Sequence, residues 1–206
     1  MDPEHDKLHV ELCVGRSDGG HGLGVGCVGN LVLWLSSGAL SVGNGFAATA
    51  GLNLKVQAPS GGSTLGDSGA LTAAQSLELV GATTVGNNVN MTATNGTLDL
   101  LTDTGGITLG TVARLSAGTD LKFALDYGGA LAIGNQFSLS SGGDLSVSAP
   151  TGGLTLGTDG TASSGGAMAV DAAPATIGDS VTLSSVGTMD MYSRFSGNMT
   201  LGTSVV

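Results

Sequence analysis

The sequence predicts an all-β fold, a single-stranded right-handed parallel β-helix of about eight coils of ~23 residues each. Three observations lead to this prediction. A short apolar stretch that ends in glycine recurs at nearly constant spacing. Apolar and polar residues alternate between these glycines, as they do in strands with one buried face. Glycine supplies 37 of the 206 residues, which is incompatible with long helices.

The recurring stretch closes each predicted coil, and we call its last residue the landmark glycine. Successive landmark glycines are separated by 23, 20, 24, 24, 23, 21 and 24 residues. Residues 53–66 and 144–157 nearly repeat each other, with 9 of 14 positions identical. The eight closing stretches are LSVG (40–43), STLG (63–66), TTVG (83–86), ITLG (107–110), LAIG (131–134), LTLG (154–157), ATIG (175–178) and MTLG (199–202).

Each coil holds three short apolar-x-apolar runs, and each run predicts a strand. One run precedes the landmark glycine, and a second begins three residues after it. Like strands of successive coils then stack about 4.8 Å apart, with right-handed winding expected from the general preference of parallel crossovers. The apolar pairs of the second and third runs include Val89/Met91, Phe137/Leu139, Val181/Leu183, Leu98/Leu100, Leu121/Phe123, Leu145/Val147 and Met189/Met191.

The repeat also predicts details of the coils. We expect the landmark glycine to occupy a corner with positive φ. The next residue is Asn, Asp or Thr in every coil, and we expect its side chain to bond turn backbone and to stack into a polar ladder. Leu109, Ile133 and Leu156 should align in one interior column. Coil 158–178 places Gly160 and Ala162 where other coils have bulky residues, which predicts a looser turn or a bulge.

The chain divides into a non-repeat leader, 1–19, expected to be disordered, and a parallel β-solenoid over 20–206. Residues 22–54 carry no charge, but glycines interrupt them, so we reject a transmembrane helix. The N-terminus lacks the pattern of a secretory signal peptide. The repeat stops in mid-coil, so we expect a piece of a longer chain. Cys13 and Cys27 leave a disulfide open and do not identify the compartment.

The amino-acid composition argues against three classes of protein. A net charge of −10 argues against nucleic-acid binding, which needs a basic surface. The hydrophobic content of 41% is too high for a disordered acidic linker. Aromatic residues make up only 3% of the chain, which is unusual for a compact enzyme, because enzyme pockets rely on aromatic side chains.

Three segments show the repeat most fully: GGDLSVSAPTGGLTLG (142–157), GTLDLLTDTGGITLG (96–110) and SVTLSSVGTMDM (180–191). They resemble the repeats of filamentous haemagglutinin-like large exoproteins, the β-helical partners in bacterial two-partner secretion, and the similarity covers about 30–206. The resemblance implies a secreted or cell-surface adhesin rod that is exported by an outer-membrane partner. It implies no catalytic residue. The chain departs from the family in lacking a secretion signal and a recognisable secretion domain, and in being far shorter.

Two sets of residues suggest chemistry, and we favour a structural interpretation of both. His5, His9 and Cys13 would share one face of a helix as metal ligands, but scattered polar residues of a disordered leader are the better interpretation. His5, His9 and His21 all precede the well-formed coils, so no Ser-His-Asp triad is expected inside the rod. The acids lie 11, 14, 13 and 12 residues before the next landmark glycine, and this drift favours solvated strand-face carboxylates over an acid–base pair: Asp99, Asp120, Asp144 and Asp190.

Other ligand motifs are incomplete. GGDLS (142–146) and TDGTA (158–162) are only fragments of a calcium-binding nonapeptide repeat. Threonine does not repeat as a T-x-T array at one register, and no phosphate loop occurs. Trp34, Tyr127 and Tyr192 are isolated, which disfavours an aromatic sugar platform. We therefore expect no catalytic residue, no metal and no cofactor.

The leading functional hypothesis is a non-enzymatic structural or adhesive segment, part of the stalk of a secreted or surface-exposed bacterial adhesin. Its partners would be a host surface or other copies of the rod, with no nucleic acid and no membrane span. Two alternatives stay open. One is a polysaccharide-active β-helix enzyme that uses Asp99, Asp120 or Asp144. The other is a segment of a trimeric phage tail fibre.

Overall fold

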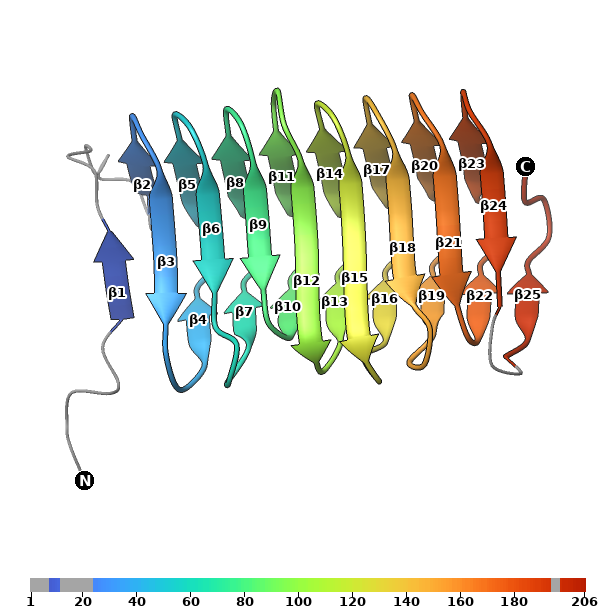
Figure 1. Cartoon of the computed structure of the whole chain (residues 1–206), viewed down its shortest axis with the longest axis horizontal. Helices are drawn as coiled ribbons and strands as arrows, with labels where there is room; N and C mark the ends of the chain where they lie inside the picture. Colours follow the sequence, from blue (N-terminus) through green and yellow to red (C-terminus); the bar gives the residue numbers. More distant parts are fainter. Residues whose placement is uncertain (1–7, 12–23, 194–196) are drawn as a thin grey trace.

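The computed structural model describes residues 8–11, 24–193 and 197–206, with side chains described from residue 24 onward. The chain is an all-β solenoid, and no helix occurs in this part of it. Its strands form three sheets that run along the whole rod (Figure 1). Each of eight coils adds one strand to each sheet, in the order sheet B, sheet A, sheet C. The predicted fold class is therefore confirmed.

The strands have these bounds. Sheet A contains β1 (Leu8–Glu11), β3 (Leu31–Leu35), β6 (Leu54–Gln57), β9 (Leu77–Val80), β12 (Leu98–Thr104), β15 (Leu121–Tyr127), β18 (Leu145–Ala149), β21 (Met168–Ala172) and β24 (Met189–Tyr192). Sheet B contains β2 (Gly24–Cys27), β5 (Ala47–Ala50), β8 (Ala70–Ala73), β11 (Asn90–Ala93), β14 (Arg114–Ala117), β17 (Ser138–Ser141), β20 (Thr161–Ser164) and β23 (Thr182–Ser185). Sheet C contains β4 (Leu40–Val42), β7 (Ser63–Leu65), β10 (Thr83–Val85), β13 (Ile107–Leu109), β16 (Leu131–Ile133), β19 (Leu154–Leu156), β22 (Ala175–Ile177) and β25 (Met199–Leu201).

The core is a set of stacked side-chain columns inside the solenoid. In sheet C, Leu109 pairs with Ile133 and Ile133 pairs with Leu156, and all three side chains are buried. The predicted interior column is therefore confirmed. Sheets A and B supply matching columns, in which every second residue of a strand faces inward.

The leader differs from the expectation at β1. These four residues pair antiparallel with β3, at the N-terminal edge of sheet A, instead of being disordered. The sequence Leu-His-Val-Glu alternates in hydrophobicity as a strand does. An antiparallel strand on β3 satisfies backbone groups that would otherwise form an open sheet edge.

The prediction of a positive φ at the landmark glycines is wrong. None of them is among the residues with positive φ. They are glycines because the neighbouring coil lies too close for a side chain. A Cβ on Gly66 would lie 2.4 Å from Asn44 Oδ1, and one on Gly110 would lie 2.6 Å from the carbonyl carbon of Gly86. Gly43, in the first coil, has nothing within 4 Å of the same position.

The left-handed residue of each corner lies two positions after the landmark glycine. In the first coil it is Gly45, and its N–H donates to the carbonyl of Asp67 in the next coil. The same bond recurs along the rod, for example from Val112 N to Asn135 O at 2.9 Å. In the other coils seven non-glycine residues hold this conformation: Ser68, Asn88, Val112, Gln136, Asp159, Ser180 and Ser204.

The predicted polar ladder is confirmed at this corner, although its bonds join coils and are not local. Where the residue after the landmark glycine is Asn or Asp, its side chain accepts from the backbone N–H of its equivalent one coil later. Asn44 Oδ1 accepts from Asp67 N at 2.8 Å, and Asp67 Oδ1 accepts from Asn87 N at 2.7 Å. Asn87 Oδ1 continues the ladder to Thr111 N at 2.8 Å. An amide or carboxylate oxygen thus bonds one coil to the next wherever this residue is Asn or Asp.

A second ladder, which the sequence analysis missed, lies at the corner that precedes the strands of sheet A. Asn30 Oδ1 accepts from Asn53 N at 3.2 Å, and Asn53 Oδ1 accepts from Ser76 N at 3.1 Å. Further along, Asp120 Oδ1 accepts from Asp144 N at 2.8 Å. Asp144 Oδ1 then accepts from the N–H of residue 167, also at 2.8 Å.

The prediction of a loose turn or bulge in coil 158–178 is wrong. Strand β20 pairs in continuous register with β17 and β23. The ring of Phe137, one coil earlier, fills the space above Gly160, where an added Cβ would lie 2.0 Å from its Cε1 atom. The same arrangement occurs between Phe46 and Gly69. A bulky residue in one coil therefore supplies the volume that its neighbour lacks.

We predict that Gly110→Ala destabilises the rod by about 1–3 kcal/mol, because its Cβ overlaps backbone atoms of the preceding coil. Gly43→Ala is the matched control, since its Cβ meets open space, and it should leave stability unchanged within about 0.5 kcal/mol. Denaturant unfolding followed by circular dichroism measures both. Equal destabilisation by the two substitutions would mean that the landmark glycine is required within its own coil and not by contact with the neighbouring coil.

We also predict strong coupling between Phe137 and Gly160. Gly160→Val should destabilise the chain by about 1–3 kcal/mol through overlap with the buried ring. Phe137→Val should destabilise it as well, by leaving a cavity. The double variant should recover stability, because Val89 and Val181 already occupy the equivalent position in other coils. A double-mutant cycle measures the coupling, and additive effects would contradict this packing.

Candidate functional site

The three outer faces of the solenoid differ in chemistry. Charged side chains gather on sheet A, where the outward column runs through Lys55, Glu78, Asp99 and Lys122 on four successive coils. Sheets B and C mainly present hydroxyl groups and small residues, with Arg114 as a charged side chain on sheet B. We call these four residues, together with the neighbouring Ser76 and Thr97, the sheet A network.

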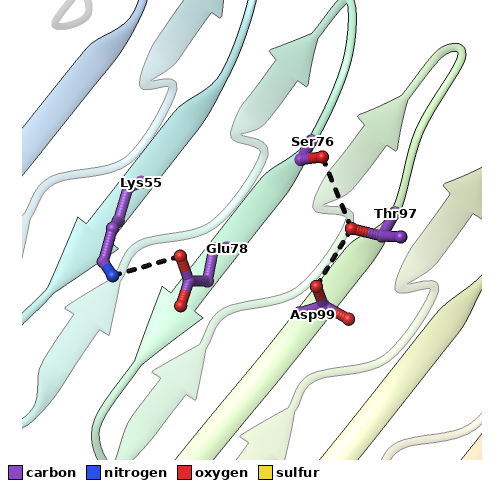
Figure 2. A network of polar contacts seen from close by, with 5 residues as sticks. All are labelled: Lys55, Ser76, Glu78, Thr97 and Asp99. Carbon is purple, nitrogen blue, oxygen red and sulfur yellow. Dashed lines mark hydrogen bonds and ion pairs between the residues drawn. The ribbon is translucent and has the colours of Figure 1, made fainter.

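The sheet A network pairs charges and hydroxyls across neighbouring coils (Figure 2). Lys55 Nζ lies 3.1 Å from Glu78 Oε2, and both side chains are about one-third exposed. Glu78 lies in register with Asp99 on the next strand. Thr97 donates from Oγ1 to Asp99 Oδ2 at 3.0 Å, and its Oγ1 also lies 3.4 Å from Ser76 Oγ. The network therefore joins three coils on one face.

In the sheet A network, the carboxyl group of Asp99 has a shifted pKa. Partial burial raises the pKa of Asp99, the hydrogen bond from Thr97 and the charge of Lys122 lower it, and the carboxylates of Glu78 and Asp120 raise it, with a net upward shift. Because the folded pKa exceeds the unfolded one, ionisation of Asp99 opposes folding at pH values above that pKa. This penalty decreases as the pH falls below the folded pKa, and it is gone below the unfolded pKa.

A solvent-open hollow of about 330 Å³ lies beside the Lys55–Glu78 pair, on the side of the first coils. Asn30, Asn53 and Ser76 from the second ladder line it together with the two charged residues. An ammonium, a carboxylate and amide groups are suited to hold a polar molecule through hydrogen bonds.

The four candidate acids do not form a converging pair. Asp99 and Asp190 belong to the outward column of sheet A, on β12 and β24, with three coils between them. Asp120 and Asp144 belong instead to the corner before the sheet A strands, where they accept backbone hydrogen bonds from the next coil. The drift in register seen in the sequence thus reflects two structural positions. The interpretation as strand-face carboxylates fits Asp99 and Asp190, and it is wrong for Asp120 and Asp144.

The candidate metal ligands are His5, His9 and Cys13. His5 and Cys13 lie outside the described residues, while His9 belongs to a strand and not to the helix that a shared metal face would need. Cys27, at the end of β2, is disulfide-bonded. In the described ranges, no three His, Cys, Asp or Glu side chains cluster in a way that could hold a metal ion.

The two calcium-motif fragments lie in corners of the solenoid. Asp144, within GGDLS, accepts a backbone hydrogen bond in the second ladder. Asp159, within TDGTA, has a φ of 57° and accepts from Thr158 Oγ1 at 3.1 Å. Both aspartates thus take part in turn hydrogen bonds.

The tryptophan and the two tyrosines are separated along sheet A, as expected. Trp34, Tyr127 and Tyr192 lie on β3, β15 and β24 and are all exposed. They belong to the first, fifth and eighth coils.

Threonine forms one outward column on sheet C, in place of the paired columns of a T-x-T array. Each strand of this sheet has three residues, and its middle side chain points outward. The signal is visible in the sequence as the residue two places before the landmark glycine. The column comprises Ser41, Thr64, Thr84, Thr108, Ala132, Thr155, Thr176 and Thr200.

No protein-family model, no curated protein and no solved structure was found to match the chain. Across the described residues, no helix is long and apolar enough to cross a membrane.

We predict that Asp144 stabilises the rod as an acceptor and not as a charge. Asp144→Ala should lower the free energy of unfolding by about 1 kcal/mol, because the N–H of residue 167 loses its partner. Asp144→Asn should have little effect, since Asn53 performs the same role earlier in the ladder. Asp190→Ala serves as an exposed control. A loss of stability in Asp144→Asn equal to that in Asp144→Ala would contradict the ladder role.

Proposed function

We propose that the chain is a structural and adhesive segment of a secreted or surface-exposed bacterial β-helical exoprotein, and that it acts as part of a stalk. The observation that carries the proposal is the unbroken register of three sheets through eight coils. At each interface between coils, a pull along the rod is divided among the paired strands of three sheets, since every coil is bonded to its neighbours. This continuity suits a rod that holds a binding surface away from a cell.

The resemblance of residues 30–206 to filamentous haemagglutinin-like repeats adds to this proposal. The partners of such a segment are a host surface or other copies of the rod, and an outer-membrane partner exports the longer protein. The division into one charged face and two hydroxyl-rich faces supports surface recognition, because the rod offers two kinds of surface chemistry along its length.

Bead adhesion tests this proposal. Beads coated with the purified chain through one terminus should attach to epithelial cells or to immobilised surface glycans more strongly than beads coated with an unrelated acidic protein of similar size. Attachment should survive repeated loading, because three strand pairs divide the force at each interface between coils. Binding no stronger than that of the control beads would overturn the adhesive part of the proposal.

A polysaccharide-active enzyme is the second candidate, and one observation favours it. Asp99 is half-buried and its pKa is raised, which is how enzymes prepare a general acid. Incubation with neutral and acidic polysaccharides, followed by measurement of new sugar ends, separates the two candidates. We expect no cleavage. Cleavage that Asp99→Asn abolishes and Asp190→Asn preserves would replace the stalk proposal with an enzyme.

A further inference from the structure

The corner between β11 and β12 is one residue longer than the equivalent corner of every other coil. Residues 94–97 form it, whereas three residues connect sheet B to sheet A in each of the other seven coils. Asn95 and Gly96 lie in the middle of this longer corner.

The additional residue leaves one backbone N–H outside the bonding between coils. The N–H groups of Thr94 and Asn95 donate to the preceding coil at 2.9 and 3.0 Å, as equivalent groups do elsewhere. The carbonyl of Gly96 accepts from Thr119 of the following coil at 3.1 Å. The N–H of Gly96 makes no hydrogen bond in the part of the chain that the structure describes.

An asparagine followed by glycine can react with its own backbone. The glycine nitrogen attacks the amide carbon of the asparagine side chain, and the absence of a Cβ on glycine leaves that nitrogen unshielded. The sequence contains two such pairs, Asn44–Gly45 and Asn95–Gly96. Both asparagine side chains are exposed, so access of water does not distinguish the two pairs.

Hydrogen bonds hold both reacting groups of the first pair. Gly45 N donates to Asp67 O at 2.8 Å, and Asn44 Oδ1 accepts from Asp67 N at 2.8 Å. The glycine nitrogen and the amide carbon can therefore meet only after the backbone bond and the ladder bond have both broken.

Only the side chain is held in the second pair. Asn95 Nδ2 donates to Ala74 O at 3.0 Å, across the exposed corner. The attacking nitrogen of Gly96 has no bond of its own to break. The longer corner thus leaves the nucleophile available in Asn95–Gly96, whereas the ladder corner restrains it in Asn44–Gly45.

We propose that Asn95 is a site of spontaneous deamidation in the folded rod. The Gly96 nitrogen loses its proton to solvent and bonds to Asn95 Cγ, the Cγ–Nδ2 bond breaks, and the amide takes up a proton and leaves as ammonia. Water then opens the succinimide ring. Attack at Cγ gives aspartate, and attack at the backbone carbonyl carbon of residue 95 gives isoaspartate. One carboxylate replaces one neutral amide, so the formal net charge of −10 becomes more negative by one. This inference does not depend on the proposed stalk function.

Incubation of the purified full chain at 37 °C and mildly alkaline pH tests the proposal. Peptide mapping by mass spectrometry localises each amide-to-acid conversion. Asn95 should convert at least about tenfold faster than Asn44, the factor expected when one hydrogen bond fewer must break. In guanidinium chloride the two asparagines should convert at similar rates, because both are followed by glycine and neither is then held by the fold.

Asn95→Gln is the matched variant, because glutamine would have to close a larger ring. Ion-exchange chromatography should show an acidic form of the original chain that grows with time and is missing in this variant, and circular dichroism should show both proteins folded. Equal rates at the two sites in the folded chain, or faster conversion of Asn44, would overturn the proposal. So would a difference that persists unchanged in guanidinium chloride, which would assign it to the flanking sequence, or an Asn95 that converts only when the chain is denatured.

Discussion

Hydrogen bonding between coils is the constraint on which the rest of this structure depends. A single coil buries too few side chains to offset the entropy of ordering its backbone, so it folds only when its neighbours satisfy its N–H and C=O groups. The strands meet this need in the three sheets, and the corners meet it through side-chain acceptors. Asn44 and Asp120 illustrate the two corner types, each of which accepts from the backbone of the next coil. Backbone hydrogen bonds between coils therefore stabilise the rod along its whole length, and the side-chain acceptors add to them at some of the corners.

Close stacking explains the side chains that the repeat tolerates. The landmark glycines are required because an added Cβ would enter the coil behind, as the contrast between Gly110 and Gly43 shows. The opposite solution appears in the core, where the ring of Phe137 extends over Gly160. The space available to a core side chain thus depends on the residue at the equivalent position one coil away. The size of a core residue can therefore be explained only together with its equivalents in the adjacent coils.

The same geometry separates structural from functional polar groups. An aspartate at a corner has its oxygen committed to backbone, as in Asp144, whereas an aspartate on the outward column of sheet A is surrounded by other side chains, as in Asp99. Variation in coil length makes an otherwise regular surface uneven, with grooves where a coil is short. The short third coil produces a groove lined by threonines, and the charged face of sheet A lies around the corner from it.

The sequence by itself determined the solenoid, the number of coils, the interior columns and the existence of a polar ladder, because these follow from a short period and from alternation along one strand. Only the tertiary structure decided why the landmark glycine is glycine, how Gly160 is packed, and that Asp99 and Asp120 occupy different environments. Each of these depends on atoms about one strand spacing away in space but more than twenty residues away in the chain. Register between coils, and not the pattern within one coil, sets those contacts.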